Sequence, residues 1–317
     1  VRDAAELGSV RCRGHASVAG RSGTPAAPDG KPVKQACQFA LAQMRVVPGD
    51  RAGNLGRAVA RIAEAATRGA DVVLLPEALD LGWAHPAALT QAEPIPGGPG
   101  CELLRHAAAD HRIFVCAGLS ERVAGAGAGG TKVFNSAVLF GPGGELLLHH
   151  RKINELDFAR RIYSVGDRLG VVDTSIGRIG LMICADAFAA GQAISRTLGM
   201  MGATLILSPC AWAVPADHDN VREPYGQLWW DNYSPAVREF GLTIAGCSNV
   251  GPITAGEWAG RKCIGNSLVC APGPRLLARG TYGESAEELL LVNVGVPASQ
   301  RTWGGDAYSS AAAGASS

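Results

Sequence analysis

Three polar residues that could carry out acyl transfer each follow an apolar segment of the chain. Glu77 follows "DVVLLP", Lys152 follows "ELLLHHR" and Cys184 follows "RIGLMI". Polar residues at the ends of buried strands project into the crevices where α/β proteins place their sites. We therefore expect the three side chains to meet, although they lie far apart along the chain.

A carboxylate, an ammonium group and a thiol form a coherent set for nucleophilic hydrolysis. A thiol with an ordinary pKa of about 8.5 is only slightly ionised at neutral pH and needs a base or a cation beside it. Glu77 could take the proton, while Lys152 could stabilise the thiolate and the oxyanion formed when sulfur attacks a carbonyl or nitrile carbon. The backbone N–H of Ala185 would complete an oxyanion hole, worth about 3–4 kcal/mol per donor. Taken singly, each residue also fits a structural role.

The elements that must position these residues alternate between strand and helix patterns. Helices are predicted over 54–69, 101–111, 193–202 and 227–241, and strands over 37–46, 70–77, 113–121, 178–184, 204–209 and 242–249. A hairpin is predicted around the turn at 141–144, and further strands over 265–273, 275–283 and 287–295. This mixture of βα units and hairpins favours an α/β fold with two helix-covered sheets over a single Rossmann sheet.

Composition restricts the class of protein. The 317 residues are 47% hydrophobic and 18% charged, with a net charge of +1, so neither nucleic acid nor an anionic membrane is expected as the main partner. No apolar run approaches the roughly 18 residues that span a bilayer. Nine cysteines without a C-x-x-C pair predict core thiols in a reducing cytoplasm rather than a disulfide framework or zinc site.

The two ends of the chain differ from its middle. We interpret residues 1–36 as a flexible N-terminal extension, 37–300 as one domain and 301–317 as a C-terminal tail, because only the middle segment has hydrophobic periodicity. A glycine-rich stretch at 124–130 is predicted to be a flexible loop.

The local sequences around the three polar residues resemble the three catalytic motifs of the nitrilase superfamily of carbon–nitrogen hydrolases. They are "LLPEALDLGW", "HHRKINELDF" and "GLMICADAFA", in that order. "GATLILSPCAW", "FGLTIAGCSNVG" and "GNSLVCAPGPRLLA" are similar to supporting segments of that family. The likeness covers roughly residues 37–296.

The resemblance implies a four-layer αββα sandwich that pairs with a second copy of itself. It implies Glu77 as general base, Lys152 as transition-state stabiliser and Cys184 as nucleophile, with no metal or organic cofactor. Many members carry a second glutamate after the lysine, and here its position falls near Ala159. We therefore consider Glu155 and Asp157 as stand-ins and favour Glu155.

The residues after the cysteine indicate a subclass by the same resemblance. Cys184-Ala185-Asp186 fits amidases and carbamoylases, whereas nitrilases typically read Cys-Trp-Glu. Asp186 either contacts substrate or orients the turn. Trp212 either lines the acyl pocket or packs as an ordinary core residue, and it is preferred to Trp83 as a pocket residue.

Other residues near the motifs are given structural roles. Cys210 has no basic neighbour in the sequence and is interpreted as structural. His149 and His150 alternate along a strand, so one should face inward and the other outward; a zinc site there lacks a third ligand.

The leading hypothesis is hydrolysis of a small amide through a thioester. A nitrilase, an N-carbamoyl amine or amino-acid hydrolase and an acyltransferase remain open alternatives on the same three residues. A papain-type Cys–His hydrolase would need one of the histidines at 85, 106, 111 or 218 beside Cys184. A non-catalytic scaffold of the same fold is the remaining alternative.

Overall fold

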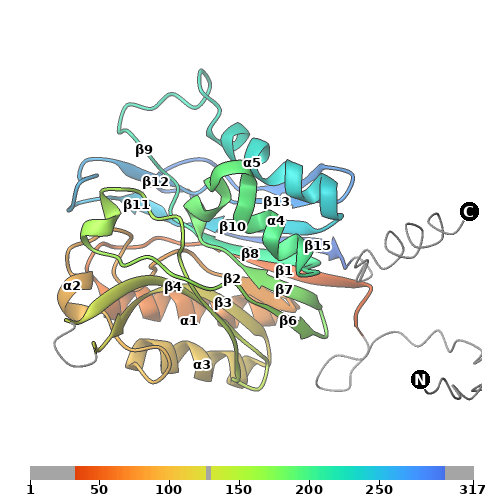
Figure 1. The fold of residues 1–317 in the computed structure, drawn as a ribbon, viewed down its shortest axis with the longest axis horizontal. Coiled ribbons are helices and arrows are strands. Elements are labelled where there is room, and N and C mark those ends of the chain that lie inside the picture. The colour runs from red at the N-terminus through yellow and green to blue at the C-terminus, as the bar shows by residue number, and fades with distance from the viewer. Residues whose placement is uncertain (1–32, 126–129, 297–317) are drawn as a thin grey trace, which may run out of the picture.

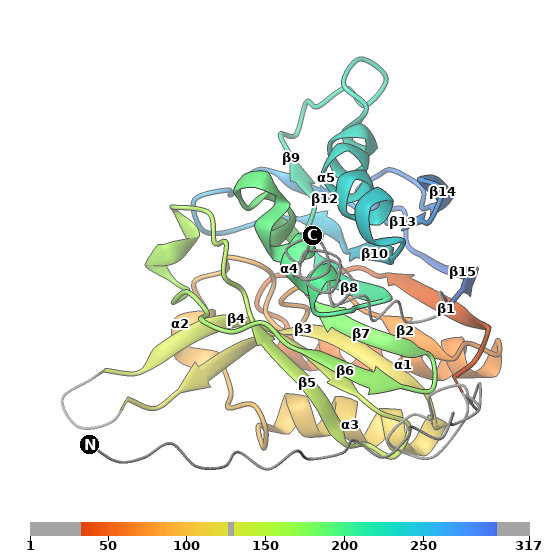
Figure 2. The ribbon, with the colours of Figure 1, turned by 45° about the vertical axis from the view of Figure 1, so that its right-hand side comes forward.

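The computed structural model describes residues 33–125 and 130–296, so most of the predicted extension, the predicted tail and the centre of the predicted glycine-rich loop lie outside the described residues. Two six-stranded sheets lie face to face, and helices cover the outer face of each (Figure 1). Helices α1 and α3 lie on one side of the molecule, and α4 and α5 lie on the other, an arrangement also visible in the turned view of Figure 2. The predicted αββα sandwich is confirmed.

The first sheet carries the strands that precede Glu77 and Lys152. Its strands follow the spatial order β15 (Glu288–Gly295), β1 (Ala36–Gln43), β2 (Val72–Leu74), β3 (Phe114–Val123), β4 (Lys132–Phe140) and β5 (Leu146–Arg151). Strands β1, β2 and β3 are parallel, whereas β4 and β5 form the predicted antiparallel hairpin. Helices α1 (Arg51–Thr67) and α3 (Pro99–His111) link the parallel strands.

The second sheet carries the strand that precedes Cys184. Its order is β14 (Arg275–Arg279), β13 (Leu268–Ala271), β10 (Thr243–Ser248), β8 (Leu205–Cys210), β7 (Gly177–Leu181) and β6 (Val171–Thr174). Helices α4 (Ala193–Met200) and α5 (Tyr225–Phe240) cover it. A small third sheet joins β11 (Val250–Pro252), β12 (Lys262–Ile264) and β9 (Ala213–Val214). Short helical turns complete the elements: α2 (Ala88–Gln91), η1 (Ala159–Arg161), η2 (Cys184–Phe188) and η3 (Ala190–Gln192).

Three apolar layers hold the sandwich together. Alternate residues of a strand point to opposite faces, so Leu205 and Leu207 pack between the sheets while Ile206 packs against the helices. Helix α1 buries Leu55 and Ile62 on one face, as its helical period predicts. The strands buried on both faces are the continuously apolar segments of the sequence.

Strands β2 and β7, which lead to Glu77 and Cys184, are shorter than predicted. Strand β2 ends at Leu74 and β7 ends at Leu181, so Glu77 and Cys184 each lie three residues beyond a strand, whereas Lys152 directly follows β5. Beyond β2 the chain contains Pro76, which lacks the N–H needed to continue a ladder. Beyond β7 the chain turns into the 3₁₀-helix η2. The apolar runs of the sequence therefore continue beyond the residues that form regular hydrogen-bonded strands.

No helix within 33–125 or 130–296 combines the length and the apolar character that a membrane crossing requires.

Candidate active site

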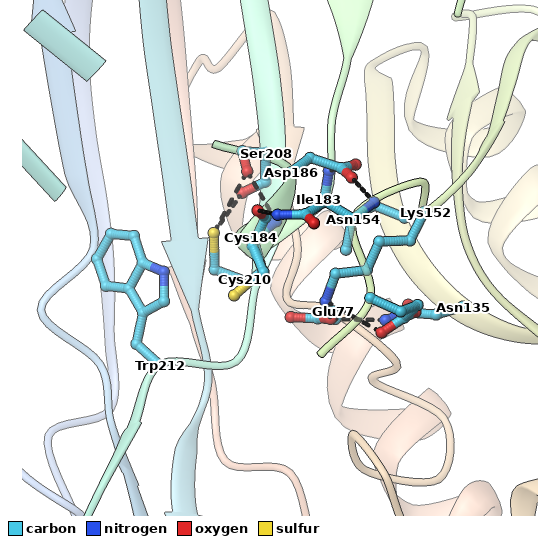
Figure 3. A network of polar contacts seen from close by, with 12 residues as sticks. Glu77, Asn135, Lys152, Asn154, Ile183, Cys184, Asp186, Ser208, Cys210 and Trp212 are labelled. Atoms are coloured by element: carbon cyan, nitrogen blue, oxygen red, sulfur yellow. Dashed lines mark hydrogen bonds and ion pairs between the residues drawn. The ribbon is translucent and has the colours of Figure 1, made fainter. Parts of the chain in front are cut away.

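Glu77 is held between the two sheets by its backbone and by one oxygen of its side chain. Its N–H donates to the carbonyl of Cys210, at the end of β8, over 3.2 Å. Its Oε1 accepts hydrogen bonds from Nδ2 of Asn135 at 2.6 Å and from Nζ of Lys152 at 2.7 Å (Figure 3). Its Oε2 is buried and has no hydrogen-bond partner among the described residues. One carboxylate oxygen is thus anchored and the other is available to take a proton.

Lys152 is a fully buried cation at the end of β5. Its N–H donates to the carbonyl of Asn135 on the neighbouring strand over 2.8 Å, and its side chain is 1% exposed. Burial alone would lower the pKa of this ammonium group, but the carboxylates of Glu155 and Glu77 outweigh it and hold the pKa well above its ordinary value. Lys152 is therefore charged, and its Nζ also lies 5.5 Å from the ring centre of Trp83.

Glu155 is the second acidic side chain beside Lys152. Its Oε2 lies 3.7 Å from Nζ of Lys152, and neither of its carboxyl oxygens has a hydrogen-bond partner among the described residues. Burial, with repulsion from Glu77 and Asp186, raises its pKa to about 7 despite the opposing charge of Lys152. Ala159, the position where the family resemblance places a glutamate, is buried. The Asp157 side chain is fully exposed. The structure thus brings Glu155, and not Asp157, to Lys152.

Cys184 lies at a sharp turn between β7 and η2. Its φ of +43° is left-handed, a conformation that costs a residue with a side chain roughly 1–3 kcal/mol and that is concentrated at functional sites. Its N–H donates to Oγ of Ser208 over 3.2 Å. The turn places Cys184 beyond the end of β7, and in Figure 3 it lies between Cys210 and the side chains of Glu77 and Lys152, whose charges act on its thiol.

The electrostatic surroundings of Cys184 favour the neutral thiol. Burial is the main cause that raises its pKa well above the ordinary value, and the thiol of Cys210 and the charge of Glu77 add to it. Lys152 acts in the opposite direction but does not outweigh them. At rest Cys184 is therefore a neutral thiol and not a thiolate stabilised by Lys152. A base must remove its proton when the sulfur attacks the substrate.

Ala185 and Asp186 form the turn that follows the thiol. The N–H of Ala185 has no acceptor among the described residues, while its carbonyl accepts a hydrogen bond from Nδ2 of Asn154 over 2.7 Å. Asp186 is 0% exposed, and its two oxygens accept four hydrogen bonds from protein groups. A carboxylate has about four acceptor positions, so Asp186 has none left for a substrate. Of the two predicted roles, the contacts favour orientation of the turn.

The two tryptophans occupy places opposite to the predicted preference. Trp212 is fully buried in the layer between the second sheet and α5, where its ring stacks on Trp229 at 4.4 Å between centres. In Figure 3 its ring lies on the far side of Cys210 from Glu77 and Lys152. The role of an ordinary core residue therefore describes Trp212 better than a place in the acyl pocket. Trp83, the less preferred candidate, is the one beside Lys152.

The remaining candidates take structural positions. His150 is buried and faces Asp186, whereas His149 lies on the other face of β5 and contacts Glu121, as their alternation predicts. Cys210 is buried beneath the site, where its thiol contacts Ser208 and the hydroxyl of Tyr233. Across the two described stretches of chain, no three histidine, cysteine or acidic side chains are grouped to hold a metal ion.

Three supporting residues were not identified from the sequence: Asn135, which holds Glu77; Asn154, which holds the carbonyl of Ala185; and Ser208, which accepts the N–H of Cys184. Asn135 interrupts the apolar segment "KVFNSAVLF", and a polar residue inside a strand buried on both faces is a usable signal. Ser208 gives the same kind of signal, because it is a polar residue inside the buried strand β8, whereas Asn154 lies in a loop, where such residues are common for local reasons.

Comparison with known proteins agrees with this geometry. The family model described as carbon–nitrogen hydrolase matches residues 38–302. A protein named nitrilase from Pyrococcus abyssi is 31% identical over 245 residues, which cover 74% of this chain and 81% of that protein. A chloroplastic omega-amidase from Arabidopsis thaliana is 28% identical over 75% of this chain and 63% of its own length.

Solved structures share the same architecture. An amidase of the nitrilase superfamily from Nesterenkonia AN1 matches with a TM-score of 0.65 and 23% identity, over 82% of this chain and 90% of that one. The family model and the relative from Pyrococcus abyssi argue against the hypotheses of a papain-type hydrolase and of a non-catalytic scaffold. The chain belongs to the carbon–nitrogen hydrolase family of the nitrilase superfamily and is a carbon–nitrogen hydrolase.

Proposed function

We propose that this protein hydrolyses small amides to a carboxylic acid and ammonia, with Cys184 as nucleophile and Glu77 as general base. The observation that carries the proposal is that the two oxygens of the Glu77 carboxylate have different surroundings. Its Oε1 is occupied by Asn135 and Lys152, whereas its buried Oε2 has no partner among the described residues. This leaves one basic oxygen free in a site where the thiol is neutral and must lose a proton.

Acylation begins when Oε2 of Glu77 takes the thiol proton and sulfur bonds to the amide carbon. The carbonyl oxygen becomes an oxyanion, for which the ammonium group of Lys152 and the N–H of Ala185 are the available donors. Protonated Glu77 then gives its proton to the amide nitrogen, the C–N bond breaks and ammonia leaves. The product of this half-reaction is a thioester at Cys184.

Deacylation returns the enzyme to its starting state. Glu77, again a carboxylate, removes a proton from water as the water oxygen bonds to the thioester carbon. As the C–S bond breaks, protonated Glu77 gives this proton to the sulfur of Cys184, and the acid leaves. In both halves Glu155 is proposed to support Lys152, because the two carboxylates keep the ammonium group charged despite its burial.

Amides are preferred to nitriles on two grounds. The sequence after the nucleophile reads Cys184-Ala185-Asp186, without the Trp-Glu pair typical of nitrilases. Several relatives are named omega-amidases, and several similar solved structures are of an amidase. The relative from Pyrococcus abyssi is named nitrilase, so hydrolysis of nitriles is the second candidate function. Pairing of the sandwich with a second copy remains part of the proposal.

A substrate panel tests the assignment. Short aliphatic amides, the nitriles of the same carbon skeletons and ureido acids are each incubated with the protein, and ammonia and acid are measured against Cys184→Ala. We expect ammonia and acid in equal amounts from amides at a kcat/KM above that for the matched nitriles and ureido acids. Faster turnover of nitriles or ureido acids would overturn the amide assignment.

A further inference from the structure

The segment that follows Lys152 is attached to the turn that follows Cys184 through one buried carboxylate. Oδ1 of Asp186 accepts the backbone N–H groups of Ile153 at 3.1 Å and of Asn154 at 2.8 Å. The contact joins two sheets of the sandwich, because Lys152 follows a strand of the first sheet and Asp186 follows a strand of the second.

The other oxygen of Asp186 binds groups that precede the two reactive residues in the chain. Oδ2 accepts the N–H of Ile183 at 2.8 Å and lies 2.8 Å from Nε2 of His150. Ile183 precedes Cys184 by one residue, and His150 precedes Lys152 by two. Lys152 is thus bracketed in the chain by groups that bind this carboxylate, whereas Cys184 lies between Ile183, which binds the carboxylate, and Asp186, which bears it.

Chemistry fixes the direction of the hydrogen bond between the two side chains. An ionised carboxylate can only accept, so Nε2 of His150 carries the proton and donates it to Asp186. Nδ1 of His150 is buried and has no partner among the described residues. Burial acts to raise the pKa of Asp186, but the contact with His150 and the backbone N–H groups outweigh it and lower that pKa. Asp186 is therefore an ionised acceptor, and no contact with substrate is required of it.

We propose that His150 and Asp186 are positioning residues that hold the Lys152 ammonium and the Cys184 thiol at the separation that acyl transfer requires. The inference rests on the proposed function of these two residues. Its physical basis is that a misplacement of about 1 Å in a reacting group can lower the rate roughly 10²-fold. Within the described residues, the other hydrogen bond that joins the segments after Lys152 and Cys184 runs from Asn154 to the carbonyl of Ala185.

Two substitutions remove the clamp in different ways. Asp186→Asn keeps the shape, but an amide has one oxygen and one NH2 group, so its NH2 must face backbone N–H donors on one side. His150→Phe keeps a ring but lacks the donor. His150→Gln is the conservative variant, because its amide nitrogen can donate from near the place of Nε2.

The experiment compares these variants with His149→Phe and Asp173→Asn as matched controls. His149 lies on the other face of the same strand, and Asp173 is a half-exposed residue of β6. For each folded protein, kcat and KM for one amide are measured well below the unfolding temperature and normalised to the number of sites that iodoacetamide labels. We expect Asp186→Asn and His150→Phe to lower kcat by roughly 10- to 100-fold with KM little changed, the scale of loss that misplacement of a reacting group can cause.

His150→Gln is expected to recover most of the kcat lost in His150→Phe, and both controls should match the wild type. An unchanged kcat per labelled site in Asp186→Asn and His150→Phe would overturn the inference, even if both proteins were less stable, because a merely structural role predicts that outcome. A loss in which KM rises and kcat does not would overturn it too. Failure of the proposed function itself is distinguished by Cys184→Ala, whose retained turnover would show that another nucleophile acts.

Discussion

A buried carboxyl oxygen of Glu155 lies 3.7 Å from the ammonium nitrogen of Lys152, although the family resemblance places the second glutamate near Ala159. The carboxylate is therefore supplied from a position four residues earlier in the chain. Because Ala159 lies in the short helical turn η1 and Asp157 points to solvent, Glu155 is the acid of this segment that reaches Lys152.

Replacing Glu155 with Gln is expected to lower kcat/KM by at least roughly tenfold, which corresponds to a loss of about 1.4 kcal/mol of transition-state stabilisation. The reason is that Lys152 loses one of the two carboxylates that keep it charged. Steady-state kinetics on the best amide of the panel measures the effect. Asp157→Asn is the matched control, because its side chain is fully exposed, and equal activity in the two variants would contradict the assignment of Glu155.

The same substitution should change how stability depends on pH. The pKa of Glu155 is about 7 in the folded chain against an ordinary 4.5, mainly because of burial. The folded state then binds more protons than the unfolded state between these values, so this group makes the protein less stable as pH rises from about 4.5 to about 7. Urea unfolding of the wild type and Glu155→Gln across this range should show a flatter profile in the variant. Parallel profiles would contradict the raised pKa.

Lys152→Gln is expected to lower kcat by roughly 10²–10³-fold, the cost of losing one oxyanion donor. The protein should also become less stable, because Glu77 and Glu155 are then buried beside each other without a cation. Activity per folded molecule is measured with Lys262→Gln as control, since the side chain of Lys262 donates to the exposed carbonyl of Ala216. Activity close to that of the control would exclude Lys152 from the chemistry.

Glu121 provides a test of stability away from the reaction. Burial raises its pKa, but hydrogen bonds from Arg151, His149 and Ser136 outweigh this and lower the pKa to about 2. Its contribution to stability is therefore present above about pH 4.5 and is lost as pH falls toward 2.

Glu121→Gln is expected to unfold at lower urea concentration than the wild type at pH 7, with the difference shrinking in acid, while kcat per folded molecule stays unchanged. Chemical denaturation at pH 7 and pH 3 measures the first effect and steady-state kinetics the second. A difference in stability that does not depend on pH would contradict the account of this cluster.

The alternating apolar strand and helix patterns predict an α/β fold with two helix-covered sheets, and the family resemblance adds that they form a four-layer sandwich. The sequence also makes Glu77, Lys152 and Cys184 candidates, because each ends an apolar run. Glu77 and Lys152 are charged residues that the core does not accept without a partner, whereas a cysteine is an ordinary core residue, so its proposed role comes from the family resemblance. The ends of β2 and β7 are less predictable, because apolar residues such as Leu75 and Met182 stay buried after the regular ladder has ended.

Contacts between segments far apart in the chain account for the rest. The place of Trp212 depends on Trp229, which comes from helix α5, and the filled acceptor capacity of Asp186 depends on the segment 150–154. The pattern of residues within one segment does not predict such long-range contacts. Periodicity does predict that His149 and His150 face opposite ways, but the partner that each meets is set by tertiary packing.

The central claim is that sulfur of Cys184 attacks the substrate, and ammonia release from an amide by Cys184→Ala tests it most directly. Cys101→Ala is the matched control, because Cys101 is a buried thiol of helix α3 that belongs to the core on the outer face of the first sheet. We predict that the Cys101 variant keeps wild-type turnover per folded molecule and that the Cys184 variant releases no ammonia above the uncatalysed rate. Sustained turnover by folded Cys184→Ala would contradict the account.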